Sequence, residues 1–249
     1  MIAATTRRVA LLPDANHYVG PALARQLVTR GHDLVVGTID ADLLAELTAA
    51  GAAIEVVDGA RDLAEPATAG LLVEAGVARF GRIDTAVAAT GRIVTGSFLK
   101  SSFDDLRAAV NGCLEAPYHF LRAVVPVMVA QADGQVLVVT SASGARPTPG
   151  APLYSSARAG ANMLVKNVAA EVARHRVEVN AVGTNFMDFP EFRRASGADD
   201  PEVRARLEAS VPLGRLGTME EFAAFCMPFV DGTSRFTTGQ FVAYAGGWA

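Results

Sequence analysis

Residues 8–31 read RVALLPDANHYVGPALARQLVTRG, and this stretch decides the fold of the chain. An aliphatic run at 8–12 is followed by a short turn and then by a helical pattern at 19–30, which Gly31 ends as a C-cap. A continuous apolar run such as residues 9–12 is typical of a strand buried on both faces. A strand of this kind that leads directly into a helix predicts the first unit of a parallel sheet covered by helices.

The same alternation continues to the end of the chain. Six further aliphatic runs lie at 33–37, 53–57, 85–88, 135–140, 178–182 and 240–243. Helical patterns separate them at 41–49, 66–79, 101–130, 152–174 and 218–230. This order predicts an α/β, Rossmann-like fold with a doubly wound parallel sheet of seven strands. Since no linker, repeat or low-complexity segment interrupts it, residues 1–249 are expected to form a single domain.

Composition and charge exclude several classes of function. Half of the residues (51%) are hydrophobic and only 19% are charged, which predicts a large core and favours an oligomer. The net charge of −4, with scattered basic residues, argues against a nucleic-acid partner. Cys113 and Cys226 lie too far apart to suggest a disulfide framework or a metal site. No apolar run approaches the ~20 residues of a membrane span, and residues 1–8 do not resemble a signal peptide, so a soluble, cytoplasmic protein without membrane contact is expected.

Three residues on and after the fifth run form a catalytic pattern. Ser141 ends the run, Tyr154 follows thirteen residues later, and Arg158 lies one helical turn beyond Tyr154 on the same face. Together with the stretches 9–20, 82–91, 110–128, 135–160, 177–185 and 212–247, this pattern resembles the short-chain dehydrogenases/reductases over nearly the whole chain. Members of that family carry Tyr-x-x-x-Lys, so Arg158 is a departure from it.

A second departure lies in the loop after the first strand. The family carries Thr-Gly-x-x-x-Gly-x-Gly here, and its glycines let the pyrophosphate of a nicotinamide cofactor approach the backbone. In this chain only Gly20 of the three glycines is kept, and Asp14 and Tyr18 replace the other two. A carboxylate repels phosphate, and a Tyr ring fills the space that glycine leaves for ribose and nicotinamide. We therefore expect no cofactor.

Together, Ser-x12-Tyr-x3-Arg and an altered glycine loop resemble the halohydrin dehalogenases (haloalcohol dehalogenases), which are related to the short-chain dehydrogenases/reductases. The resemblance implies that Ser141 orients the substrate hydroxyl and that Tyr154 takes its proton. Arg158, a fixed cation, favours the phenolate form of the neighbouring phenol.

The segment after the sixth run differs from the dehydrogenase pattern as well. Dehydrogenases read Asn-x-x-x-Pro-Gly, whereas this chain has Thr and Asn at 184 and 185. The dehalogenase resemblance implies a halide site there, and the irregular segment 186–200 is expected to cover the ligand crevice. Backbone N–H groups, an amide and the positive edges of aromatic rings suit a large, polarizable anion. The residues implied are Tyr18, Thr184, Asn185, Phe186, Met187, Phe189 and Phe192.

The function so implied is that of a carbon–halide lyase. It closes vicinal haloalcohols to epoxides by intramolecular displacement of halide, and it opens epoxides with halide, azide, cyanide or nitrite, without a metal or an organic cofactor. One alternative is an NAD(P)-dependent short-chain oxidoreductase with a degenerate glycine loop, which Asp58 and Asn111 favour. Another is a non-catalytic subunit, which the intact Ser141 and Tyr154 oppose. A homotetramer is expected to form through the helices at 101–130 and 152–174, with Trp248 packed into a partner chain.

Overall fold

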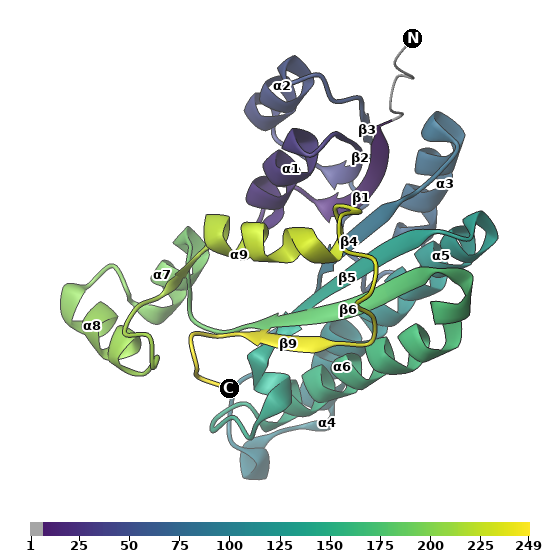
Figure 1. Cartoon of the computed structure of the whole chain (residues 1–249). Coiled ribbons are helices and arrows are strands. Elements are labelled where there is room, and N and C mark those ends of the chain that lie inside the picture. The colour runs from purple at the N-terminus through teal and green to yellow at the C-terminus, as the bar shows by residue number, and fades with distance from the viewer. Residues whose placement is uncertain (1–6) are drawn as a thin grey trace.

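Seven parallel strands form the sheet of the computed structural model, which describes residues 7–249 (Figure 1). The order across the sheet is β3-β2-β1-β4-β5-β6-β9. Each of the seven predicted runs is a strand, which confirms the predicted fold, whereas the expectation for the first residues falls mainly on 1–6, outside the described part. The strands are β1 (Arg8–Asp14), β2 (His32–Thr38), β3 (Ile54–Val56), β4 (Thr85–Ala89), β5 (Gly134–Ser141), β6 (Val177–Thr184) and β9 (Phe241–Tyr244).

Helices cover both faces of the sheet. One face carries α1 (Gly20–Thr29), α2 (Ala41–Ala49) and α9 (Met219–Cys226), and the other carries α3 (Thr68–Phe80), α5 (Ala116–Gln131) and α6 (Pro152–Val172) (Figure 1). Alternate residues of β5 serve the two cores: Val136 packs with the α3, α5 and α6 side, and Leu137 with the α1, α2 and α9 side. Each fully buried aliphatic side chain contributes about 1.5–3 kcal/mol, which explains why the strands contain so few polar residues.

The predicted helix at 101–130 is wrong in one respect, because it is three segments. α4 (Phe103–Val110) leads into a π-helix, η2 (Asn111–Glu115), and then into α5. In the wide π-helical turn, the Cys113 thiol donates to the Arg92 carbonyl at 3.4 Å, and a Cβ at Gly112 would lie 2.5 Å from the Cβ of Arg92. The interruption therefore depends on a tertiary contact with residue 92. Short 3-10 helices in the described part are η1 (Phe98–Lys100), η3 (Ala142–Ala145), η4 (Ala173–His175) and η5 (Met227–Phe229).

The segment after β6 is more ordered than the irregular crossing expected for 186–200. β7 (Met187–Asp188) pairs with β8 (Gly217–Thr218), and α7 (Pro190–Ser196) and α8 (Pro201–Ala209) lie between them, beyond the carboxyl end of β6 (Figure 1). Asp188 accepts hydrogen bonds from Arg193 at 2.8 Å and Arg204 at 2.7 Å. The bond from Arg204 and then that from Arg193 lower the pKa of Asp188. The Asp188 carboxylate thus links α7 and α8 to β7.

A buried polar network joins the amino ends of the strands, opposite the catalytic pattern. Arg8 donates to His32 Nε2, to the Asp84 carbonyl and to Gln135 Oε1, each at 3.3 Å. His32 is fully buried, its Nδ1 lies 3.0 Å from the Leu27 carbonyl, and burial followed by the charge of Arg8 lowers its pKa. No helix of the described residues is both long and apolar enough to cross a membrane.

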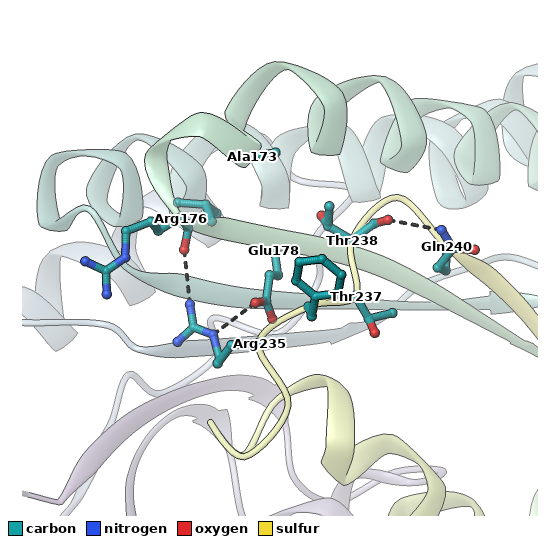
Figure 2. A pocket seen from close by; sticks show the side chains of 9 residues that line it. Ala173, Arg176, Glu178, Arg235, Thr237, Thr238 and Gln240 are labelled. Atoms are coloured by element: carbon teal, nitrogen blue, oxygen red, sulfur yellow. Dashed lines mark hydrogen bonds and ion pairs between the residues drawn. The ribbon is translucent and has the colours of Figure 1, made fainter.

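A cavity of about 680 Å³ lies at the same amino-terminal end of the strands and is lined in part by Arg176, Glu178 and Arg235. Figure 2 shows Arg235 between the Glu178 carboxylate, at 3.0 Å, and the Arg176 carbonyl, at 3.1 Å. Because Ser141 lies at the carboxyl end of β5, this cavity and the catalytic pattern lie at opposite ends of the strands.

Candidate active site

Ser141 is the last residue of β5 and lies in register with Thr184, the last residue of β6. Its hydroxyl accepts the Ser143 N–H at 3.1 Å and donates to the Thr184 carbonyl at 3.3 Å. The side chain is buried, with 6% exposure. Backbone groups therefore hold Ser141 at the carboxyl end of the strands, where parallel α/β folds bind their ligands.

Tyr154 and Arg158 lie on consecutive turns near the start of α6, which begins at Pro152. The Arg158 guanidinium lies 5.2 Å from the centroid of the Tyr154 ring, and both side chains are buried (4% and 8% exposed). Within the described part of the chain, the Tyr154 hydroxyl has no hydrogen-bond partner, so it is available to a ligand. The structure thus brings the predicted cation and phenol together.

The loop after β1 differs physically from a phosphate-binding loop. The Asp14 carboxylate accepts the backbone N–H groups of Asn16, at 2.9 Å, and His17, at 3.1 Å. Asn16 in turn donates to Thr38 at 3.0 Å and accepts the Asp40 N–H at 2.6 Å. The Asp14 carboxylate thus occupies loop N–H groups that could otherwise bind an anion. The hydrogen bonds of Asn16 join the end of β1 to the end of β2.

Tyr18 has a left-handed backbone, with φ 55°, at a position where the family has glycine. Its ring packs edge-on against Phe189 at 5.0 Å and tilted against Phe222 at 6.3 Å, and its hydroxyl lies 2.5 Å from Thr184 Oγ1. Burial raises the pKa of Tyr18, so the hydroxyl stays protonated. A bulky residue in this conformation costs about 1–3 kcal/mol and persists only where its surroundings fix it.

A dinucleotide bound through the family's glycine loop does not fit these residues. The ring of Tyr18 replaces a glycine, and Asp14 presents a negative charge. Asp58 is exposed in the turn after β3, where it could meet adenine, and Asn111 donates to Glu115 at 3.1 Å inside the π-helix. No group of three or more His, Cys, Asp and Glu side chains that could hold a metal occurs within residues 7–249.

The residues implied for a halide site form two neighbouring groups. Tyr18 contacts both Thr184 and Phe189. The Phe192 ring lies between those of Phe189 and Phe186, with ring centroids 6.1 Å apart in each pair. Met187 belongs to the core, with 2% exposure.

Asn185 directly follows Thr184, the last residue of β6. Its amide nitrogen is buried and has no hydrogen-bond partner among the described residues. A buried donor left unsatisfied costs about 1–3 kcal/mol, which marks this nitrogen as a place for an acceptor.

Trp248 contacts residues of its own chain, and its expected packing into a partner chain stays a prediction. Its ring meets Phe186 at 6.1 Å, the Arg146 guanidinium lies 4.7 Å from its centroid, and Arg146 donates to its carbonyl at 2.6 Å. The C-terminal tail therefore joins the loop after β5 to the segment after β6.

Two residues next to Arg158 were missed by sequence reasoning. Thr90 follows β4 and accepts from Arg158, and Asn162 lies one turn further along α6. The spacing of Arg158 and Asn162, four residues apart on one helix face, is the signal that could have found the second of them.

The chain belongs to the short-chain dehydrogenases/reductases, and within them to the family described as enoyl-(acyl carrier protein) reductase, whose model matches residues 15–249. It is 28% identical over 247 residues to the uncharacterized oxidoreductase YohF of Escherichia coli K12, covering 97% of this chain and 95% of that protein.

Two solved structures share the fold over nearly their full length. Acetoin dehydrogenase from Enterobacter cloacae has a TM-score of 0.83 and 27% identity, with 97% of this chain and 96% of the other covered. A structure titled "Dehalogenation enzyme" also has a TM-score of 0.83 and 27% identity, with 98% and 99% covered. The chain is therefore similar to oxidoreductases and to an enzyme of dehalogenation.

Proposed function

We propose that this protein is a halohydrin dehalogenase, a cofactor-independent lyase that converts vicinal haloalcohols to epoxides and halide. The single observation that carries the proposal is Tyr18. Its ring and hydroxyl are fixed, in a strained left-handed conformation, where a nicotinamide-binding loop has glycine. The similarity to a solved dehalogenation enzyme supports the same reaction class.

In the proposed reaction, Ser141 turns its hydroxyl from the Thr184 carbonyl to the substrate oxygen. Tyr154, as phenolate, takes the hydroxyl proton. The alkoxide oxygen then attacks the neighbouring carbon from the side opposite the halogen, the new C–O bond closes the epoxide, and halide leaves with the electron pair of the C–X bond. The nucleophile is part of the substrate, so no covalent enzyme intermediate is needed. Tyr154 afterwards releases its proton to water.

Arg158 supplies the positive charge that this base requires. It is charged at any working pH, and it lies against the Tyr154 ring in a buried site where charges interact strongly. In the family pattern, a Lys at this position also binds the nicotinamide ribose, and an Arg directed at Tyr154 keeps only the electrostatic role.

The leaving halide would be received at the carboxyl end of β6. Asn185 offers a buried amide N–H without a partner, and Thr184, Tyr18 and Phe189 border the same strand end. These are neutral donors and ring edges, which bind an anion without holding it as tightly as a free cation would. The same site would admit azide, cyanide or nitrite for ring opening.

A second candidate is the NAD(P)-dependent short-chain oxidoreductase that the sequence also allowed. The matched family and the curated relative favour it more than they favour the dehalogenase, because both are described as reductases or oxidoreductases. Tyr18, Asp14 and Arg158 oppose it on physical grounds, as described above.

Two measurements on the purified protein separate the candidates. Bromide release from a simple vicinal bromohydrin, without added cofactor, is expected, and calorimetric titration with NAD(H) and NADP(H) is expected to show no binding. Micromolar affinity for any of the four nucleotides, with no bromide released, would reject the dehalogenase and establish the oxidoreductase.

A further inference from the structure

Among residues 7–249, Arg158 is a buried cation without an acidic partner. None of the ion pairs formed within residues 7–249 includes it. Its Nη1 donates to Thr90 Oγ1 at 3.2 Å and its Nη2 donates to the Thr90 carbonyl. Both acceptors are neutral oxygens, so the charge itself is uncompensated, and burying such a charge is costly unless the site supplies a counter-ion.

The titratable and charged groups on the segments around this face do not supply that counter-ion. The π-helix contributes Cys113, which donates to the Arg92 carbonyl, and Glu115, which is exposed and bound to Asn111. Of the acids of α4, Asp104 is exposed and Asp105 is bonded to the N-cap residue Ser102. These groups include Tyr18, Arg92, Asp104, Asp105, Arg107, Cys113, Glu115, Arg146 and Tyr154 itself. None of them places a carboxylate in an ion pair with the guanidinium.

Asn162 lies one turn beyond Arg158 on the same face of α6. Its Oδ1 accepts from Thr140 at 2.8 Å, while its Nδ2 is buried without a partner in the described part of the chain. The Nε of Arg158 is likewise buried and without a partner there. Side chains four residues apart on a helix are neighbours, and both unsatisfied groups are donors. One oxygen acceptor between them, such as a buried water, would satisfy both.

Two glycines leave the room that this arrangement needs. A Cβ at Gly91 would overlap the Arg158 guanidinium, and a Cβ at Gly144 would lie 2.6 Å from Asn162 Nδ2. The guanidinium is therefore packed against the backbone at Gly91 and the Asn162 amide against the backbone at Gly144, which restricts the position of each.

Building on the proposed function, we propose that Thr90 is a positioning residue that holds Arg158 against Tyr154 through neutral acceptors alone, and that the neutral Asn162 leaves the guanidinium without a competing acid. Thr90 holds the Nη groups, and the Asn162 amide lies one helical turn from Arg158 on the same helix. Because no acid competes for the guanidinium, the Tyr154 phenolate becomes its counter-ion. The positive charge thus acts on the catalytic base instead of being neutralised by a resident carboxylate.

Asn162→Asp tests this directly, since it places a carboxylate beside the guanidinium at nearly constant size. The rising limb of the kcat-against-pH profile is expected to move up by about one to two pH units, as a competing nearby charge requires, with little change in KM. Asn167→Asp is the matched control: it adds the same charge at an exposed position on the same helix and should leave the profile unchanged.

Ionisation of Tyr154 can also be followed without substrate, as the ultraviolet difference between each protein and its Tyr154→Phe counterpart. Its midpoint is expected to rise in Asn162→Asp and to stay constant in Asn167→Asp. If wild type releases no halide but this midpoint moves, the positioning role stands and the proposed reaction fails. If halide is released but neither the profile nor the midpoint moves, the positioning role is wrong.

Should Asn162→Asp not fold, Thr90→Asp places the carboxylate on the opposite side of the guanidinium. The same upward movement is expected of it, and its absence in a folded Thr90→Asp protein would overturn the proposal.

Discussion

The Tyr18 hydroxyl lies 2.5 Å from Thr184 Oγ1, which fixes the loop after β1 to the end of β6. The same Thr184 accepts the Ser141 hydroxyl through its carbonyl at 3.3 Å. One residue therefore connects the ring that replaces a cofactor-loop glycine to the serine of the catalytic pattern.

Replacing Tyr18 with glycine should weaken halide binding without restoring a cofactor. The change relieves about 1–3 kcal/mol of backbone strain but removes a packed ring worth about 3–5 kcal/mol, so the melting temperature should fall. Calorimetry should show no NAD binding while Asp14 holds the loop N–H groups. Tyr18→Phe is the control, because it keeps the ring and loses only the bond to Thr184. Micromolar NAD binding by Tyr18→Gly would show that Asp14 is no barrier.

Ser141→Ala and Tyr154→Phe should each reduce epoxide formation by about 10²–10⁴-fold, the usual contribution of a positioned acid or base. Arg158→Lys keeps the charge but loses the planar fork that meets both Thr90 oxygens, so activity should fall well below wild type. Circular dichroism checks that the fold is intact. Wild-type turnover by Arg158→Lys would mean that a charge alone, without the fork, is sufficient.

Bromide and chloride should inhibit ring closure competitively, because they bind where halide leaves. Asn185→Ala removes one buried donor, and a hydrogen bond to a charged group is worth about 1.5–3 kcal/mol, or roughly tenfold or more. Bromide inhibition and turnover should therefore weaken together. A sulfate salt of equal ionic strength is the control, since screening alone should have little effect at a buried site. Unchanged bromide inhibition in Asn185→Ala would place the halide elsewhere.

Stability should decline in mild acid because of His32. Burial, followed by the charge of Arg8, lowers its pKa in the folded state, so the unfolded chain takes up the proton first as pH falls. This contribution to stability is complete above about pH 6.5 and is lost as pH falls from there toward the lowered folded-state pKa. Denaturant titrations at pH 8 and pH 5.5 measure it. His32→Gln, which offers Arg8 a non-titrating acceptor, should be less stable overall but flatter with pH; an equal slope would assign the effect to other groups.

The outer surface of α5 and α6 should join copies of the chain into a homotetramer. A groove of about 520 Å³ between the two helices is lined by Leu121, Val125, Leu164 and other side chains, and Tyr118 and Met163 are exposed nearby. Apolar surface of this kind is commonly covered by a partner. Sedimentation at micromolar concentration measures the assembly, and a monomer there would contradict this expectation.

Regular elements could be predicted from the sequence because each carries its own periodicity. Most of the seven strands are continuous apolar runs, and Ser141 could be placed at the end of β5 because the run ends there. β7 and β8 could not be predicted, since each has two residues and its partner lies about thirty positions away. The π-helix was missed for a similar reason, because it depends on contacts with Arg92.

The candidate site follows the same rule. The spacing of Ser141, Tyr154 and Arg158 is local information and could be found by comparison with a family pattern. The bond between Tyr18 and Thr184 spans 166 positions. That the Asn185 amide nitrogen and the Arg158 Nε have no partner in the described part of the chain is visible only once the neighbouring residues are in place. Sequence reasoning could thus suggest which residues react, but not what holds them.

The three positions where the family's loop has glycine are under two different constraints, backbone packing at one and ligand contact at the other two. Gly20 is kept, and a Cβ there would overlap the Asp14 carbonyl, so its role is in the packing of β1 against α1. The two lost glycines are those that would face a ligand. Each replacement opposes a nucleotide independently, Asp14 by charge and Tyr18 by volume, so neither reversion alone reopens the site. Under the proposed function, nucleotide binding would therefore require both positions to change together, which single mutations do not achieve.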